Sequence, residues 1–375
     1  MGNPCALTSS PGHHFFGYYE KSPWNGDESM MLGHRTTFQD RRPTVTDAAD
    51  ICLVSTGGGV TRIASTRAWD FQQGAMLQWI GPRFDRFIYN DRAAGRFVSR
   101  IHDQTGEKRR TIREPVYAVS PVGETAFTLD FGRLDITRPG YGYASEHTSD
   151  DIQACPVDDG VFRLDLETGS RTLLVSLAEL SEIEPTGTMD CGLHWVNHIQ
   201  CSPTGERIAF IHRSETPDDR RWLDRLYVTT ERGTDLQLLH SGLVSHYDWR
   251  TDDSLLVWTD HEKTGFHDYS LEGEVRSVGH DILPPDGHCS FSPNGEWLLL
   301  DSSPDDNDQR GLFLYEWERD RLHELTHVYS PPVTDASLRC DLHPRWDRSG
   351  RVICFDSTHE GTRQMYTLDV SAYTA

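Results

Sequence analysis

The hydrophobic and polar positions of this chain follow one pattern that recurs along its whole length. A short apolar run is followed by a Ser-Pro-x-Gly-like turn, a second apolar run, a polar loop, a third apolar run and a charged hairpin. The turn is most complete at 22–27, 120–124, 202–206 and 292–296, and is degenerate at 91–95, 250–253 and 347–350. Proline fixes φ and glycine accepts positive φ, which suits both residues to such turns. The pattern therefore predicts seven similar units of short strands.

The third apolar run of each unit has the length and composition of a β-strand. These runs lie at 51–54, 97–101, 161–166, 225–228, 265–269, 312–315 and 364–368, and most precede a turn and a further short strand. Four-stranded units of about 40 to 50 residues are typical of propeller blades. We therefore predict an all-β fold: a seven-bladed β-propeller with four-stranded antiparallel blades, forming one domain over 1–375. A β-sandwich or two stacked domains is the alternative, which the regular recurrence disfavours.

The same spacing sets the expected blade boundaries. Blades are expected to begin near residues 13, 69, 114, 190, 244, 286 and 338. The last unit stops after its third strand, so the N-terminal segment around 6–8 is expected to supply the outer strand and close the ring. The insertion at 132–160, rich in Gly and Tyr, is too long for a blade loop and is expected to cover one face. Helix patterns are weak, and 175–180 supports one or two turns at most.

Composition and charge narrow the partners. The 375 residues are 36% hydrophobic, enough for a large core, and carry a net charge of −22. Nucleic acids and anionic membranes require a basic surface, so the charge argues against both. The N-terminal residues lack the basic start and apolar run of a secretory signal. The eight scattered cysteines form no CxxC pair and fit reduced thiols. We expect a cytoplasmic protein and leave its oligomeric state open.

Histidines recur where the innermost strand of a blade should begin. His246, His288 and His343 occupy this position in three successive units. The first and fourth units place His13, His14, His34, His194 and His198 in similar segments. This recurrence predicts that several imidazoles converge on the ring axis. The alternative is that each imidazole forms structural hydrogen bonds with a neighbouring blade.

Asp341 and His343 suggest a metal site. They are two residues apart, so on a strand both side chains would point to one face. With His288 they would give two histidines and one carboxylate, a set suited to a divalent Mn, Fe, Ni or Zn ion. The alternative is an ion pair in which Arg339 or Arg345 fixes the aspartate.

Residues 190–370 resemble the oligogalacturonate lyases, the cytoplasmic seven-bladed propellers of polysaccharide lyase family 22. The segment 246–249 resembles the one that carries the family's catalytic base, and 287–291 resembles a segment with one metal ligand. The stretch 197–203 is also similar. The segment 338–344 occupies the place of three further ligands: His343 matches one, Asp341 replaces another, and Leu338 cannot replace the glutamine. These departures imply a relative with another substrate.

The resemblance implies β-elimination at a uronic acid of an acidic oligosaccharide. The C5 proton becomes removable when a divalent metal such as Mn or Zn, or an arginine, neutralises the adjacent carboxylate. We expect His246 to be the base, with Arg213 and His198 as further catalytic candidates, and His288, Asp341 and His343 as metal ligands. The expected substrate-binding residues are His13, His14, Tyr18, His34, Arg35, His194 and Arg339.

Two other functions stay open. A glycoside hydrolase would need two carboxylates in the pocket, and the candidates near the axis are Glu20, Asp190, Asp248 and Asp341. A non-enzymatic propeller that binds protein partners predicts axial histidines without metal and an exposed apolar rim.

Overall fold

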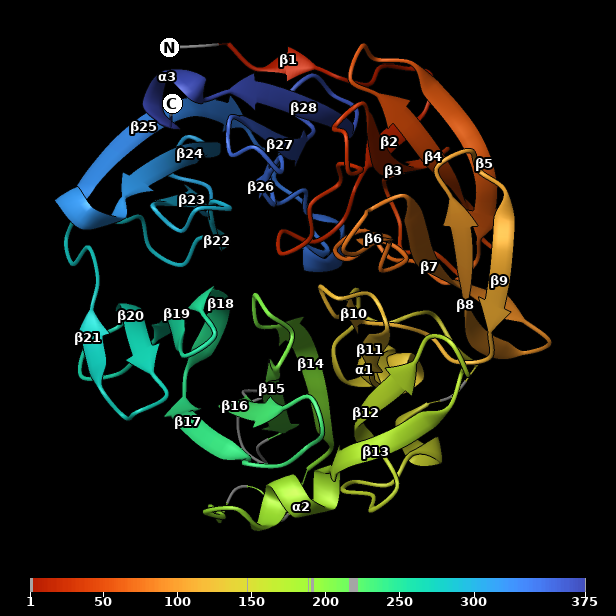
Figure 1. Cartoon of the computed structure of the whole chain (residues 1–375), viewed down its shortest axis with the longest axis vertical. Helices are drawn as coiled ribbons and strands as arrows, with labels where there is room; N and C mark the ends of the chain where they lie inside the picture. Colours follow the sequence, from red (N-terminus) through yellow and green to blue (C-terminus); the bar gives the residue numbers. More distant parts are fainter. Residues whose placement is uncertain (1–2, 147, 188, 190–191, 216–221, 375) are drawn as a thin grey trace.

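The computed structural model describes residues 3–146, 148–187, 189, 192–215 and 222–374. These residues form seven four-stranded antiparallel sheets arranged in a ring (Figure 1). The predicted seven-bladed β-propeller is therefore confirmed. Blade 1 contains β2 (His13–Phe15), β3 (Met30–Thr36), β4 (Ala49–Ser55) and β5 (Val60–Thr66); blade 2 contains β6 (Gln78–Ile80), β7 (Arg86–Ala93), β8 (Arg96–Asp103) and β9 (Lys108–Ile112); blade 3 contains β10 (Ala118–Val119), β11 (Thr125–Thr128), β12 (Gly160–Asp165) and β13 (Arg171–Ser176).

The second half of the ring repeats the arrangement, with the first strand of each blade nearest the axis (Figure 1). Blade 4 contains β14 (His194–Cys201), β15 (Arg207–Glu215), β16 (Trp222–Thr230) and β17 (Gln237–Gly242); blade 5 contains β18 (Val244–Thr251), β19 (Ser254–Thr259), β20 (Gly265–Ser270) and β21 (Val275–Ser277); blade 6 contains β22 (Cys289–Phe291), β23 (Trp297–Asp301), β24 (Gln309–Glu316) and β25 (Arg321–Tyr329); blade 7 contains β26 (Arg345–Trp346), β27 (Val352–Ser357), β28 (Gln364–Asp369) and β1 (Cys5–Ala6).

Blade 7 joins the two ends of the chain, as predicted. Strand β1 pairs antiparallel with β28, with Cys5 opposite Thr367. The Leu7 backbone N–H then donates to the Met365 carbonyl at 2.8 Å, and the Thr8 hydroxyl donates to Gln364 Oε1 at 2.7 Å. Helix α3 (Ser371–Thr374) follows β28 and brings the C-terminal segment close to β1 (Figure 1).

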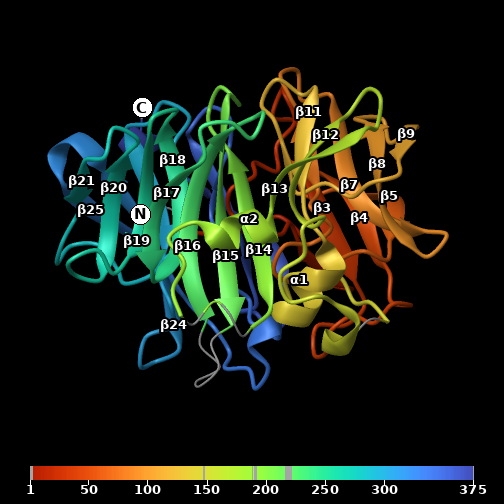
Figure 2. The same cartoon turned by 90° about the horizontal axis from the view of Figure 1, so that it is seen from below.

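The insertion between β11 and β12 contains a helix that the sequence pattern did not predict. Helix α1 (Phe131–Thr137) begins at Asp130, whose side chain accepts hydrogen bonds from the Gly132 and Arg133 backbone N–H groups. Arg133 Nη1 then donates to the His194 carbonyl at 3.0 Å, which fastens the insertion to blade 4. Figure 2 shows the ring from the side, with α1 near one of its two faces. A second helix, α2 (Leu177–Glu182), falls largely within the stretch expected to form one or two turns.

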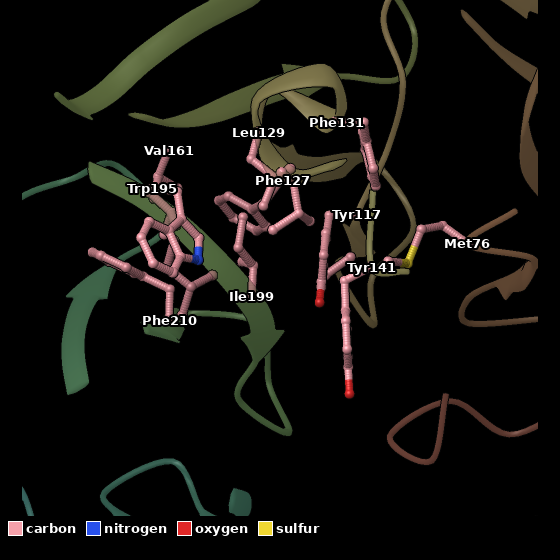
Figure 3. Packing of buried hydrophobic residues seen from close by; sticks show 14 of the residues in the cluster. Met76, Tyr117, Phe127, Leu129, Phe131, Tyr141, Val161, Trp195, Ile199 and Phe210 are labelled. Carbon is pink, nitrogen blue, oxygen red and sulfur yellow. The ribbon is translucent and has the colours of Figure 1, made fainter. Parts of the chain in front are cut away.

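Apolar side chains from adjacent blades pack together and fix the inner strands. The largest cluster joins blades 3 and 4 and includes Phe127, Trp195 and Phe210, all fully buried (Figure 3). Burial of each such side chain contributes roughly 2 kcal/mol. Each blade is therefore held by its two neighbours, and the start of each inner strand is positioned from both sides.

His34 belongs to this core rather than to the axial site. It is fully buried in β3, and its ring stacks on Phe15 with centroids 4.9 Å apart. The Ala75 backbone N–H donates to His34 Nε2 at 3.0 Å. Burial lowers the pKa of His34 from 6.5 to about 4, so the folded protein keeps this imidazole neutral.

The shift in the pKa of His34 predicts a loss of stability in acid. Below pH 6.5 the unfolded chain protonates this imidazole and the folded protein does not, so the contribution is complete above pH 6.5 and is lost as the pH falls towards 4. In His34→Gln, which keeps a hydrogen-bond acceptor, the decrease in unfolding free energy between pH 7 and 5 should be smaller by up to about 2 kcal/mol. Urea unfolding at both pH values measures this. His280→Gln, at an exposed histidine, should match the wild type; an equal decrease in all three proteins would contradict the assignment.

Candidate active site

Three histidines from successive blades meet at the ring axis. The ring centroids of His246 and His288 are 4.1 Å apart, and those of His288 and His343 are 4.3 Å apart. Tyr18, from the segment after β2, lies edge-on to His343 at 5.0 Å. The structure therefore places together the three imidazoles that the repeat pattern singled out.

Irregular backbone aims these side chains at the axis. His246 lies within a register shift between Val244 and Tyr247 of β18, and His198 lies within a similar shift in β14. A bulge adds one residue to a strand and redirects a side chain. His198 and His343 also adopt positive φ values of 53° and 44°, which are costly for residues other than glycine.

One buried carboxylate joins two of the three histidine segments. Asp301, at the end of β23, accepts hydrogen bonds from the His288 backbone N–H at 2.7 Å and from His288 Nδ1 at 3.0 Å. Its second oxygen accepts from the His343 backbone N–H at 3.2 Å. Asp301 was not among the residues predicted from the sequence. The signal that could have identified it is an acidic residue directly after the apolar run 297–300.

The anchored histidines leave one ring nitrogen free. Nδ1 of His288 is engaged by Asp301, and Nδ1 of His343 lies 2.9 Å from the Gly17 carbonyl. Among the residues that the structure describes, Nε2 of His288 and Nε2 of His343 have no hydrogen-bond partner. Candidate ligand atoms of His288, Asp341 and His343 all lie within 4.8 Å of one another. Because anchoring of Nδ1 is typical of metal-bound histidine, this triad is a possible metal-binding site.

Asp341 is already paired with two arginines. Arg310 Nη2 lies 2.7 Å from Oδ1, and Arg339 Nε lies 2.5 Å from Oδ2. Burial would raise the pKa of Asp341, but the guanidinium groups of Arg339 and Arg310 lower it to about 2. The carboxylate therefore stays ionised, and a bound metal would share it with both arginines.

The prediction that Asp341 and His343 point to one face of a strand was wrong. Both residues lie in irregular backbone before β26, not on a strand with alternating faces. His343 has a positive φ of 44°, so side chains in this segment do not alternate between two faces as they would on a strand. Arg339 forms the ion pair with Asp341 that was the alternative to a metal site, whereas Arg345 pairs with Asp356 at 2.8 Å.

His246 is held in one orientation beside the triad. Its Nδ1 lies 3.0 Å from Asp286 Oδ1, and 13% of its side chain is exposed. Burial lowers the pKa of His246, as does the neighbouring His288, and the hydrogen bond to Asp286 opposes this only in part. A neutral imidazole that donates through Nδ1 to Asp286 presents a basic Nε2.

The other two catalytic candidates have protein partners. His198 is at the axis, where its Nε2 lies 3.2 Å from the Tyr19 hydroxyl and its ring stacks on Tyr247 at 4.2 Å. Arg213 Nε donates to Asp224, and Arg213 Nη1 donates to Asn197 Oδ1 at 2.7 Å. Both side chains therefore serve at least to fix the inner strands of blades 4 and 5.

Most expected substrate-binding residues are held elsewhere. His14, which follows His13 in β2, bonds Gln364 Oε1 at 2.9 Å, and Arg35 pairs with Asp50 at 2.6 Å. His194 lies between His212 Nε2 at 2.9 Å and the Met189 carbonyl at 2.8 Å. In blade 1 the axis is occupied by Tyr18 and Tyr19, which follow β2, and not by the histidines within it.

Tyr18 and Arg339 do lie beside the histidines, together with a residue from the insertion. Arg339 Nη2 donates to the Tyr141 hydroxyl at 2.7 Å, and the Arg138 guanidinium lies over the Tyr141 ring at 4.2 Å. Burial would raise the pKa of Tyr141, but Arg339 and Arg138 lower it overall. The insertion is evident in the sequence, but this contact is not, because it depends on how the inserted segment folds back.

Comparisons with known proteins agree with the fold. No family model matches the chain. The uncharacterized protein YidR of Escherichia coli (strain K12) is 29% identical over 115 residues, which are 30% of this chain and 26% of YidR. The chain therefore matches about a quarter of the length of this relative.

Solved structures match over nearly the whole chain. A crystal structure of oligogalacturonate lyase from Vibrio parahaemolyticus is 14% identical with a TM-score of 0.67, covering 98% of this chain and 94% of that one. An oligogalacturonate lyase in complex with manganese is 16% identical with a TM-score of 0.69, covering 98% and 93%. The β-propeller domain of Cps50 (Swd1) from Myceliophteria thermophila is 13% identical with a TM-score of 0.54, covering 99% and 100%. At these identities the likeness shows the propeller fold alone.

Across the described ranges, no helix is long and apolar enough to cross a membrane.

Replacement of Asp301 should destabilise the protein. In Asp301→Asn, the amide nitrogen would face an N–H donor, because both carboxylate oxygens accept hydrogen bonds. We expect the free energy of unfolding to fall by about 2 to 4 kcal/mol in urea denaturation. Asp253→Asn, at an exposed aspartate, should change it by less than about 0.5 kcal/mol. Equal stability of the two variants would show that Asp301 does not join the histidine segments.

Proposed function

We propose that this protein is a lyase that cleaves a uronic-acid-containing oligosaccharide by β-elimination. The observation that carries the proposal is the ring-to-ring arrangement of His246, His288 and His343, in which Nδ1 of each ring faces an acceptor within the protein. A fold shared with two oligogalacturonate lyase structures supports it.

His246 is the proposed base. With Nδ1 held by Asp286, its Nε2 accepts the proton from C5 of the sugar, the C4–O4 bond breaks, and a double bond forms between C4 and C5. O4 leaves with the saccharide bonded to it and takes up a proton from water. The His246 side chain is 13% exposed, against 6% for His288, so His246 is the more accessible of these two histidines.

The acidity of the C5 proton depends on neutralising the sugar carboxylate. Arg339 is the candidate cation of the protein, because its guanidinium is partly exposed and is held by Asp341 and Tyr141. His288, Asp341 and His343 would hold a divalent metal. When bound, such an ion supplies Lewis-acid charge that stabilises the enolate-like transition state.

Loss of the base should abolish elimination. His246→Gln is expected to reduce the rate by a factor of about 10² to 10⁴. The rate is followed as ultraviolet absorbance of the unsaturated product on a panel of galacturonate, glucuronate and ulvan-type oligosaccharides. His240→Gln is the matched control, because His240 also pairs with an aspartate, at 2.8 Å, but lies on β17 away from the axis.

Three outcomes of this experiment would count against the proposal. Undiminished activity in His246→Gln would remove the proposed base. Products without a double bond would indicate hydrolysis, for which Glu20 and Asp248 are the candidates that share a cavity; Asp190 lies outside the described residues. No cleavage of any substrate in the panel would favour a non-enzymatic propeller.

The metal assignment has a test that does not require activity. Protein freed of metal with a chelator should bind Mn²⁺ or Zn²⁺ in isothermal titration calorimetry, and His288→Ala or His343→Ala should weaken binding by at least about tenfold. His323→Ala is the control, because His323 Nε2 also has no partner within the described ranges but lies outside the triad. Unchanged affinity in both triad variants would exclude the triad as the site.

A further inference from the structure

We propose that the outer rim of blade 2 binds a short acidic oligosaccharide. Residues 83–114, which span most of this blade, contain nine arginine or lysine residues and five aspartate or glutamate residues. The whole chain has the opposite balance, with 36 basic and 58 acidic residues. Blade 2 therefore carries a local excess of positive charge on a strongly acidic protein.

The excess is concentrated on β9, the outermost strand of blade 2 (Figure 1). This strand reads Lys108-Arg109-Arg110-Thr111-Ile112, and Arg113 follows it. Within their described bounds, the outer strands of the other six blades contain at most one arginine or lysine each. Charged residues commonly protect the open edge of a sheet from pairing with another strand. That role applies equally to all seven outer strands, so it does not explain why β9 is the strongly basic one.

The acidic residues of this segment are already paired with arginines. The pairs are Asp85 with Arg83, Asp91 with Arg100, Asp103 and Glu107 with Arg109, and Glu114 with Arg171. Four basic side chains form no ion pair and no side-chain hydrogen bond among the residues that the structure describes: Arg96, Lys108, Arg110 and Arg113. Their charges are therefore available to a ligand.

These four side chains are also accessible. Arg96, Lys108 and Arg113 are exposed, and Arg110 is half-buried. A guanidinium group can hold a carboxylate through two parallel hydrogen bonds, and a lysine adds a point charge. From Lys108 to Arg113 the chain extends roughly 17 Å at the usual rise of a strand. A chain of uronic acids, which has one carboxylate on each unit, can therefore contact several of these cations at once.

The charge around the patch favours a short ligand over a nucleic acid. The protein carries a net charge of −22, so a long polyanion would extend beyond blade 2 onto acidic surface. At physiological ionic strength charges are screened over about 8 Å. A short oligosaccharide that stays on the patch is therefore largely shielded from the repulsion of the rest of the protein.

A second copy of the chain fits this surface less well. A symmetric dimer built on β9 would place one basic strand against the other, because both partners of such a dimer use the same surface. Docking of β9 on an acidic region elsewhere on another copy would be a head-to-tail contact, which leads to rings or open chains. An acidic oligosaccharide meets neither constraint.

The choice of a uronate ligand rests on the proposed function, but the surface is separate from the axial site. Strand β9 is the outer strand of blade 2, whereas His246, His288 and His343 belong to the inner segments of blades 5 to 7 (Figure 1). Binding at β9 would hold an acidic oligosaccharide on the protein without occupying the axis.

The chain permits a selective labelling test, because its lysines are Lys21, Lys108 and Lys263. Trigalacturonate with one carboxyl group converted to an N-hydroxysuccinimide ester is added to protein freed of metal with a chelator. Attack of Lys108 Nζ on the ester carbonyl forms an amide and releases N-hydroxysuccinimide. Peptide mass spectrometry measures the labelling rate of each lysine relative to its rate with the small acetyl ester. Lys108 should be labelled at least about fivefold faster than the exposed Lys263, because binding raises the local reagent concentration.

Matched controls show whether the charge of β9 is responsible. Unmodified trigalacturonate should slow the labelling of Lys108, and its uncharged trimethyl ester should not. Arg110→Gln/Arg113→Gln should remove the preference for Lys108, because both carboxylate-binding groups beside it are lost. Arg321→Gln/Arg351→Gln, which removes the same charge from two exposed arginines outside blade 2, should match the wild type.

Several results would overturn the proposal. These are equal relative labelling of Lys108 and Lys263, unchanged labelling in Arg110→Gln/Arg113→Gln, and stronger protection of Lys108 by a short DNA strand of equal charge than by trigalacturonate. A dimer in sedimentation that the same double variant abolishes would show that a second copy binds here instead. Failure of the proposed lyase function is seen separately, as absence of unsaturated product, and leaves the labelling of Lys108 unchanged.

Discussion

The geometry of the axis depends on the carboxylate of Asp301. In the described residues each blade is a separate sheet, so individual contacts between blades, rather than a continuous backbone ladder, set the relative positions of the inner strands. Asp301 meets this need by accepting hydrogen bonds from two segments of different blades. The same bonds orient His288 and satisfy a charge that would otherwise be buried without a partner. The ring-to-ring contact between His288 and His343 follows from this anchor.

The distribution of charge gives the axis its chemical character. The chain as a whole carries a net charge of −22, yet it buries Arg213, Arg310 and Arg345, each paired with an aspartate. Arg339 shares the carboxylate of Asp341 with the buried Arg310, but the Arg339 side chain is partly exposed. Two arginines around the single carboxylate of Asp341 leave one positive charge in excess near the axis.

Much of the fold could be predicted because the repeat unit is local. Each third strand lies where an apolar run lay, and the N-terminal strand closes blade 7, since strand and turn patterns belong to single blades. The phase of the repeat also located His246, His288 and His343. The same phase grouped His14 and Arg35 with them, whereas in the structure His14 contacts Gln364, Arg35 pairs with Asp50, and Tyr18 from the segment after β2 lies beside the histidines. Asp301, Arg310 and Tyr141 could not be found this way, since their roles arise from contacts between blades and from the folded insertion.

The closure of blade 7 has a consequence for the order of assembly. Strand β1 is synthesised first, but its partner β28 leaves the ribosome only after the other six blades. Until then β1 and the exposed edge of blade 1 have no final neighbours, and the ring stays an open arc with two unprotected sides. The axial histidines belong to the last three blades to be synthesised, so their cluster is complete only when blade 7 has been made.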